Sequence, residues 1–131
     1  MITLLLVDDE PLVRQGLHTL LERVGDIRVI GEASNGADAI KLAQTLHPDV
    51  VLMDISMPAP DGIAATVALR ASVPQCAVVL LGLSDDASMR AQAHAAGAAT
   101  LVGKQEGIRT LLAAIREAGG KGSVSAQERK A

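Results

Sequence analysis

The feature that most constrains this chain is an uninterrupted apolar run, residues 50–53, that ends at the carboxylate of Asp54. Four apolar residues in a row are typical of a strand that is buried on both faces, and such strands lie in the interior of parallel sheets. In open α/β folds the carboxyl ends of the strands face the crevice that binds ligands. We therefore expect Asp54 to face a functional crevice; an aspartate that only caps the strand end is the alternative for this residue taken alone.

The rest of the chain alternates between predicted strands and predicted helices. Residues 3–7, 77–83 and 100–103 are further predicted strands, and residues 27–33 alternate in the manner of an edge strand. Helical patterns separate these strands, and glycine or proline residues end the helices. Because such alternation implies parallel strands joined by right-handed crossovers, the sequence predicts an α/β fold, a doubly wound five-stranded parallel sheet with five helices.

Composition narrows the class of protein. The chain has 131 residues, of which 49% are hydrophobic, and fits one domain; no apolar run approaches the ~18 residues of a membrane span. A net charge of −3 without a basic cluster argues against direct binding of nucleic acid by this segment. The single cysteine, Cys76, agrees with a reducing cytosol, so a cytoplasmic location is expected. The absence of aromatic residues removes the usual stacking surfaces for flavins, bases and sugars.

Charged residues follow three of the predicted strands. Asp8 and Asp9 follow the first strand, Asp54 ends the third, and Lys104 follows the fifth. Carboxylates that converge raise one another's pKa unless a cation lies among them, and oxygen ligands that leave coordination positions open suit Mg²⁺. A carboxylate beside Mg²⁺ and a lysine is also a competent phosphoryl acceptor.

These residues resemble the pattern of response-regulator receiver domains, the phosphoryl-accepting modules of two-component signalling. The resemblance rests on the Asp8-Asp9 pair, on Asp-Ile-Ser-Met-Pro at 54–58 followed by Asp61-Gly62, and on Lys104, and it covers residues 2 to about 119. It implies a flavodoxin-like sheet with strand order 2-1-3-4-5 and a signalling domain rather than an enzyme. Residues 1–119 are then the predicted receiver domain, and the polar, glycine-rich residues 120–131 are predicted to be a flexible tail or the start of a linker.

The resemblance also implies a role for each of these residues. Asp54 would accept a phosphoryl group from a histidine kinase. Asp9, Asp54 and the backbone carbonyl of Ser56 would bind Mg²⁺ directly, and Asp8 would help through a water molecule. Lys104 would form an ion pair with the phosphoryl group.

Two shorter segments are most similar to NarL/FixJ (LuxR-type) transcription regulators. These are Leu-Ser-Asp-Asp at 83–86 and Ala-Ile-Arg at 114–116. Regulators of that type carry a DNA-binding helix-turn-helix domain after a linker, and this sequence contains no such domain. The resemblance therefore implies either a stand-alone receiver or a segment that controls transcription through a C-terminal DNA-binding output domain.

Three positions depart from the family pattern. Counted back from Lys104, the Ser or Thr that normally ends the fourth strand is Gly82, which has no hydroxyl to bind a phosphoryl oxygen. Ser84 lies on the same side of the strand and would substitute only through a loop shift. The second switch residue, normally aromatic, is Leu101. Two interpretations stay open: a phosphorylation switch with altered signalling, or an atypical receiver that acts as a phosphorylation-independent dimerisation or partner-binding module.

One further position departs from the family pattern, and the residues argue against two rival functions. Gln105 follows Lys104 where many relatives have proline. A Mg²⁺-dependent phosphatase with an aspartyl nucleophile usually needs a second Asp two residues later, where this chain has Ser56. A flavodoxin-like redox carrier needs a hydroxyl-rich loop after the first strand, where this chain has acidic residues 8–10, and aromatic residues around the flavin.

A homodimer is possible, and the sequence indicates two surfaces for it. The first combines the alanine-rich helix at 87–96, which carries Met89, with the last helix, whose Arg109 and Arg116 are expected to point outward toward a symmetric mate. The second combines the first and last helices, where Leu12 is expected to be exposed.

Overall fold

The computed structural model describes residues 1–83 and 86–130, with residues 121–130 described as backbone only. Across these residues five strands alternate with five α-helices, as the sequence predicts. The strands are β1 (Ile2–Val7), β2 (Ile27–Ala33), β3 (Val50–Asp54), β4 (Ala77–Gly82) and β5 (Thr100–Gly103). The helices are α1 (Pro11–Glu22), α2 (Gly36–Leu46), α3 (Gly62–Ser72), α4 (Ala87–Ala96) and α5 (Ile108–Lys130), with a short 3₁₀ turn, η1 (Lys104–Glu106), after β5.

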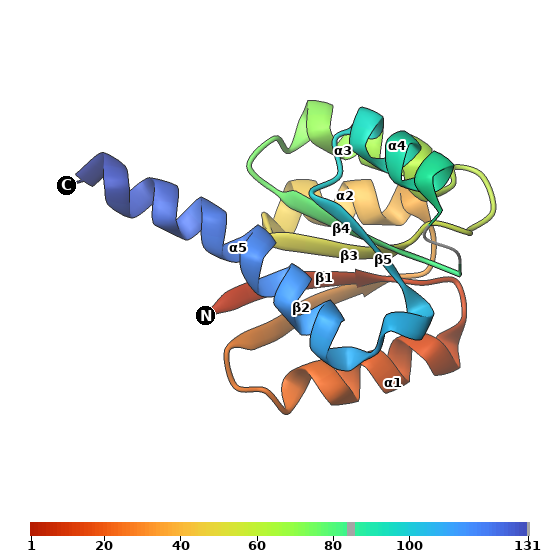
Figure 1. Ribbon diagram of the computed structural model, residues 1–131, viewed down its shortest axis with the longest axis horizontal. Coiled ribbons are helices and arrows are strands. Elements are labelled where there is room, and N and C mark those ends of the chain that lie inside the picture. Colours follow the sequence, from red (N-terminus) through yellow and green to blue (C-terminus); the bar gives the residue numbers. More distant parts are fainter. Residues whose placement is uncertain (84–85, 131) are drawn as a thin grey trace.

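The strands form one parallel sheet in the order β2-β1-β3-β4-β5, which confirms the predicted topology. β3 lies at the centre and is buried throughout, whereas the alternating strand β2 lies at an edge. Figure 1 shows α1 and α5 on one side of the sheet and α2, α3 and α4 on the other. Because helices cover both faces, the inner strands require apolar side chains in both directions.

Two separate apolar cores result from this arrangement. In β1, Leu4 and Leu6 pack in the core beneath α1 and α5, while Leu5 and Val7 pack in the core beneath α2, α3 and α4. Successive side chains of a strand point to opposite faces, so an unbroken apolar run fills both cores. No helix in the described part of the chain is long and apolar enough to cross a bilayer.

Gly62 allows α3 to begin directly against the end of β3. Its neighbour Asp61 caps the helix, since the Asp61 carboxylate accepts the backbone N–H of Ala64 at 2.9 Å. A Cβ atom on Gly62 would lie 2.6 Å from Cα of Ile55 and 2.8 Å from the carbonyl oxygen of Asp54. Any larger residue would therefore displace the backbone that carries Asp54.

The C-terminal helix continues past residue 119 to Lys130, and the domain boundary at 119 stays a prediction. Arg116 is exposed, as expected, and its Nε and Nη2 atoms lie 2.7 and 3.0 Å from the Asp26 carboxylate of the same chain. Its contact with a symmetric mate stays a prediction. The turn before β2 brings Asp26 next to α5, a proximity that no local pattern contains.

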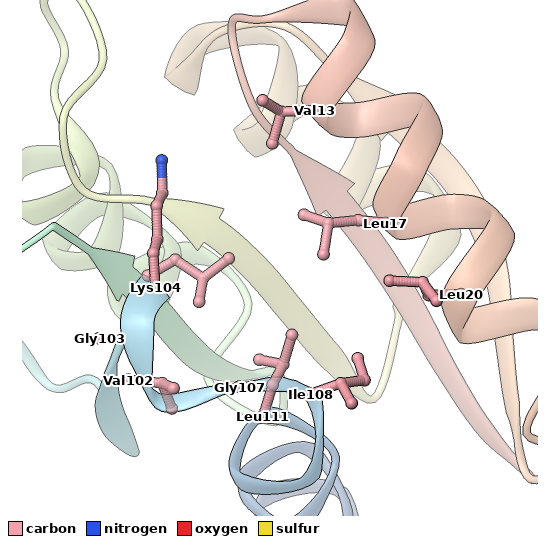
Figure 2. Close-up of a pocket in the computed structure, with 10 residues that line it drawn as sticks. Val13, Leu17, Leu20, Val102, Gly103, Lys104, Gly107, Ile108 and Leu111 are labelled. Atoms are coloured by element: carbon pink, nitrogen blue, oxygen red, sulfur yellow. The ribbon is translucent and has the colours of Figure 1, made fainter.

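Helix α1 is less completely covered than its apolar stripe predicts. Leu21 is fully buried, but Leu20 is 43% exposed and Leu12 is 81% exposed. Val13, Leu17 and Leu20 face an apolar groove of about 280 Å³, and Ile108 and Leu111 of α5 line its other wall (Figure 2). The two helices on this side of the sheet therefore leave an apolar surface between them.

Candidate functional site

Asp8, Asp9 and Asp54 meet at the carboxyl edge of the sheet. Each offers one carboxylate oxygen, and these three oxygens all lie within 4.8 Å of one another. The register explains the proximity, because Val7 at the end of β1 pairs with Met53 of the neighbouring strand β3. The structure thus brings together the three carboxylates that the sequence placed at strand ends.

Asp54 is held in a fixed orientation at the end of β3. Its side chain is only 4% exposed. Oδ1 accepts the backbone N–H of Ser56 at 2.9 Å, and Oδ2 lies 3.3 Å from Nζ of Lys104. The ammonium group comes from the far side of β4, where β5 ends and η1 begins. The cluster therefore contains three carboxylates and one ammonium group, as the sequence predicts.

Asp8 is the most deeply buried of the three carboxylates, at 1% exposure. Oδ1 accepts the backbone N–H of Glu10 at 2.9 Å, but the buried Oδ2 has no hydrogen-bond partner among the residues that the structure describes. Burial raises the pKa of Asp8, and the charges of Asp54 and Asp9 add to this effect against the opposing Glu10 N–H and Lys104. A buried oxygen without a donor is costly, so the site favours a positive ligand at this position.

The donor set fits a hard divalent cation. Carboxylate oxygens are the protein ligands that Mg²⁺ prefers, and Mg²⁺ usually keeps several of its own waters. Asp9 is exposed and Asp8 is buried, so the cluster has an open side toward solvent. Ser56 is exposed in the loop after β3; its N–H orients Asp54, and the assignment of its carbonyl as a metal ligand stays a prediction.

Arg14 contributes to the site and was not expected from the sequence. Its Nη1 donates to the backbone carbonyl oxygen of Asp8 at 2.7 Å, and its Nε lies 3.0 Å from Oε1 of Glu32 on β2. The other oxygen of Glu32 lies 2.6 Å from Nδ1 of His18. Arg14 and His18 are four residues apart and therefore share one face of α1. This spacing alone predicts the contact with Glu32 only weakly, because Glu32 belongs to another element.

The departures from the family pattern occupy well-defined places. Gly82 ends β4 and pairs in register with Gly103 at the end of β5. Leu101 is 4% exposed and belongs to the core beneath α2, α3 and α4. Ser84 lies outside the described residues.

Cys76 takes no part in the site. The residue is fully buried, and burial raises the pKa of its thiol to about 11. A thiol that stays protonated at neutral pH is a poor nucleophile and a poor metal ligand.

Known proteins are similar in sequence to this chain over most of its length. The response regulator receiver domain family matches residues 4–116. The response regulator GacA of Pseudomonas aeruginosa is 39% identical over 117 residues, which are 89% of this chain and 55% of GacA. The response regulator UvrY of Escherichia coli K12 is 40% identical over 116 residues, which are 88% of this chain and 53% of UvrY. The chain thus spans about half the length of the curated relatives it matches.

Solved structures agree with this relationship. The signal receiver domain of NarL from Mycobacterium tuberculosis is 32% identical and superposes with a TM-score of 0.84, covering 91% of this chain and 96% of that domain. A LuxR-family two-component response regulator from Aurantimonas is 30% identical with a TM-score of 0.88, covering 92% of this chain and 86% of that structure. With its acidic cluster, its lysine and these relatives in agreement, the chain belongs to the response regulator receiver domain family.

Proposed function

We propose that Asp54 of this receiver domain accepts a phosphoryl group from the phosphohistidine of a histidine kinase. The observation that carries the proposal is the position of the Asp54 carboxylate, 3.3 Å from the ammonium group of Lys104 and within 4.8 Å of two further carboxylates. Phosphoryl transfer depends on positioning and charge balance, and both are supplied by this arrangement.

In the proposed reaction a carboxylate oxygen of Asp54 attacks phosphorus, and the bond from phosphorus to the histidine nitrogen of the donor breaks. The nitrogen keeps the bonding electron pair and takes up a proton, while Asp54 becomes an acyl phosphate. The Ser56 N–H fixes the carboxylate, and Lys104 balances the negative charge of the incoming oxygens. Mg²⁺ supplies further positive charge beside those oxygens when it is bound.

For the metal, we propose Asp9, Asp54 and the Ser56 carbonyl as direct ligands and Asp8 as a ligand through water. The exposure of Asp9 supports its direct role, because a metal that keeps several waters needs a ligand on the open side of the cluster. The buried, unpartnered Oδ2 of Asp8 supports a role for Asp8 in the same site.

We further propose that the domain regulates transcription from the cytoplasm. The matched segment covers only 55% of GacA and 53% of UvrY, which leaves room in a longer protein for a C-terminal DNA-binding output domain. A net charge of −3 supports the view that this segment itself does not bind DNA.

A second candidate function is a phosphorylation-independent dimerisation or partner-binding module. Two observations favour it: Gly82 supplies no hydroxyl, and Leu101 is already packed inside the core. The apolar groove between α1 and α5 is a surface for such a contact, and Lys104 lies at its rim (Figure 2). In this case the oligomeric state would not depend on phosphorylation.

The two functions are separated by incubating the chain with acetyl phosphate and Mg²⁺, with a parallel sample that contains a chelator. The proposed function predicts an acyl phosphate in the first sample and none in the second, measured by intact mass. An unmodified chain in both samples, together with unchanged sedimentation, would instead support the phosphorylation-independent module.

A further inference from the structure

The neighbouring strands β4 and β5 both end in glycine at the edge of the sheet that carries the proposed phosphoacceptor. Gly82 pairs in register with Gly103. Asp54 pairs with the residue that precedes Gly82, and Lys104 follows Gly103. The edge of the sheet next to Asp54 therefore presents two residues without side chains.

The side chain of Gln105 fills part of this space. A Cβ atom built on Gly103 would lie 2.7 Å from Oε1, 2.8 Å from Nε2 and 2.9 Å from Cδ of Gln105. The carboxamide of Gln105 thus lies against Cα of Gly103, on the face of the sheet where a side chain at 103 would project. The backbone of Gly103, with φ −74° and ψ 138°, is ordinary extended chain, so no torsional demand requires glycine there.

The same carboxamide lies on the face of the sheet toward which a side chain at 82 would also project. Gly82 pairs in register with Gly103, and residues paired across neighbouring parallel strands point their side chains to the same face. The turn that presents Gln105 is fixed, because Oε2 of Glu106 accepts the backbone N–H of Gly103 at 2.5 Å.

We propose that the carboxamide of Gln105 donates a hydrogen bond to the phosphoryl group on Asp54 and replaces the hydroxyl that Gly82 cannot supply. This inference rests on the proposed function of Asp54. A primary amide has two N–H donors, and rotation about its last torsion exchanges the nitrogen and the oxygen, so the donor can be turned toward an anion. Hydrogen bonds to charged oxygens are stronger than neutral ones.

The test measures binding of the phosphomimetic beryllofluoride in the presence of Mg²⁺, since its fluorines take the place of phosphoryl oxygens. We expect Gln105→Ala to weaken beryllofluoride binding about tenfold, the lower end for a charge-assisted bond because Gln105 is exposed. Affinity for Mg²⁺ alone and the unfolding midpoint should match those of the parent chain.

Gln105→Glu is the matched control for a role in packing. Glutamate has nearly the same shape but carries no N–H at neutral pH, so it should weaken binding at least as much as alanine. If Gln105→Glu, or both variants, bind beryllofluoride as tightly as the parent, the donor role is wrong.

A second route to the same test leaves Gln105 unchanged. Gly103→Ala places a methyl group where the carboxamide lies, and the end of a flexible side chain gives way more easily than backbone. It should weaken binding as Gln105→Ala does, and the double variant should be no weaker than Gln105→Ala alone. Additive losses would contradict the proposal.

Gly82→Thr provides the reciprocal experiment. It should restore affinity for beryllofluoride in the Gln105→Ala background by returning a hydroxyl to the end of β4. If affinity is not restored, the view that the Gln105 amide takes the place of a hydroxyl at 82 is wrong. The failure of this inference is distinct from failure of the proposed function, because a parent chain that does not bind beryllofluoride at all would overturn the role of Asp54 as well.

Discussion

Nη1 of Arg14 lies 2.7 Å from the backbone carbonyl oxygen of Asp8, and this hydrogen bond joins helix α1 to the loop that carries Asp8 and Asp9. The same guanidinium contacts Glu32 on β2, so Arg14 connects three elements of the fold. Its side chain is only 20% exposed. A charged donor in such a position constrains the backbone between β1 and α1, and with it the separation of Asp8 from Asp54.

Replacement of Arg14 should therefore weaken the metal site. Arg14→Gln removes a charged donor to a part-buried carbonyl, which is expected to cost about 1–2 kcal/mol of stability and to lower the affinity for Mg²⁺. Affinity is followed by NMR shift changes during titration with Mg²⁺. Arg28→Gln, at an exposed position of β2, is the control. If both variants bind Mg²⁺ like the parent chain, Arg14 has no positioning role.

His18 should make the stability of the α1–β2 contact depend on pH. Its hydrogen bond to Glu32 is the main reason that the pKa of His18 is raised above 6.5, and Glu22 adds to the effect. Because the folded state favours the protonated imidazole, the stabilisation is complete below the unfolded pKa and is lost as the pH rises through the raised folded pKa. His18→Gln should thus lower the urea midpoint more at about pH 5.5 than at about pH 9. An equal loss at both pH values would contradict this role.

The two aspartates after β1 should differ in their effect on Mg²⁺. Asp9→Asn is expected to lose more affinity than Asp8→Asn, since only Asp9 is proposed to contact the metal directly. Asparagine keeps the shape of each side chain, which matters for Asp8 because it is 1% exposed. NMR titration of both variants decides the matter, and losses of equal size would show that the two residues share one role.

Self-association should involve α1 and α5 rather than α4. Leu12 is 81% exposed, whereas Met89 packs against the core, so a charge at 89 would cost stability rather than test a surface. Leu12→Glu is expected to shift the sedimentation of the chain toward monomer without lowering its melting temperature. Val67→Glu, on an α3 side chain that is 55% exposed, is the control. A dimer that is unaffected by Leu12→Glu would place the contact elsewhere.

The fold and the acidic cluster were accessible from the sequence because both depend on local patterns. Doubly apolar runs predict central parallel strands, and residues after such strands must gather at one edge of the sheet. Asp8, Asp9, Asp54 and Lys104 were placed in this way, and the structure brings them together.

The contacts between distant elements were not accessible. The pairing of Arg116 with Asp26, the bond from Arg14 to Asp8 and the incomplete cover of Leu20 all depend on how a helix docks on the sheet. Gln105 departs from the proline of many relatives, and the contact of its side chain with Gly103 leaves no signal in the sequence. Side-chain contacts between different helices and strands leave no periodic pattern in the sequence.

The most direct test of the account compares the parent chain with Asp54→Asn after incubation with acetyl phosphate and Mg²⁺. Asparagine has almost the same shape as aspartate but is a much poorer nucleophile, so the variant should fold cooperatively and remain unmodified. Phosphate-affinity electrophoresis should show a retarded band for the parent chain and none for the variant. Equal retardation of both chains would contradict the assignment of Asp54 as the phosphoacceptor.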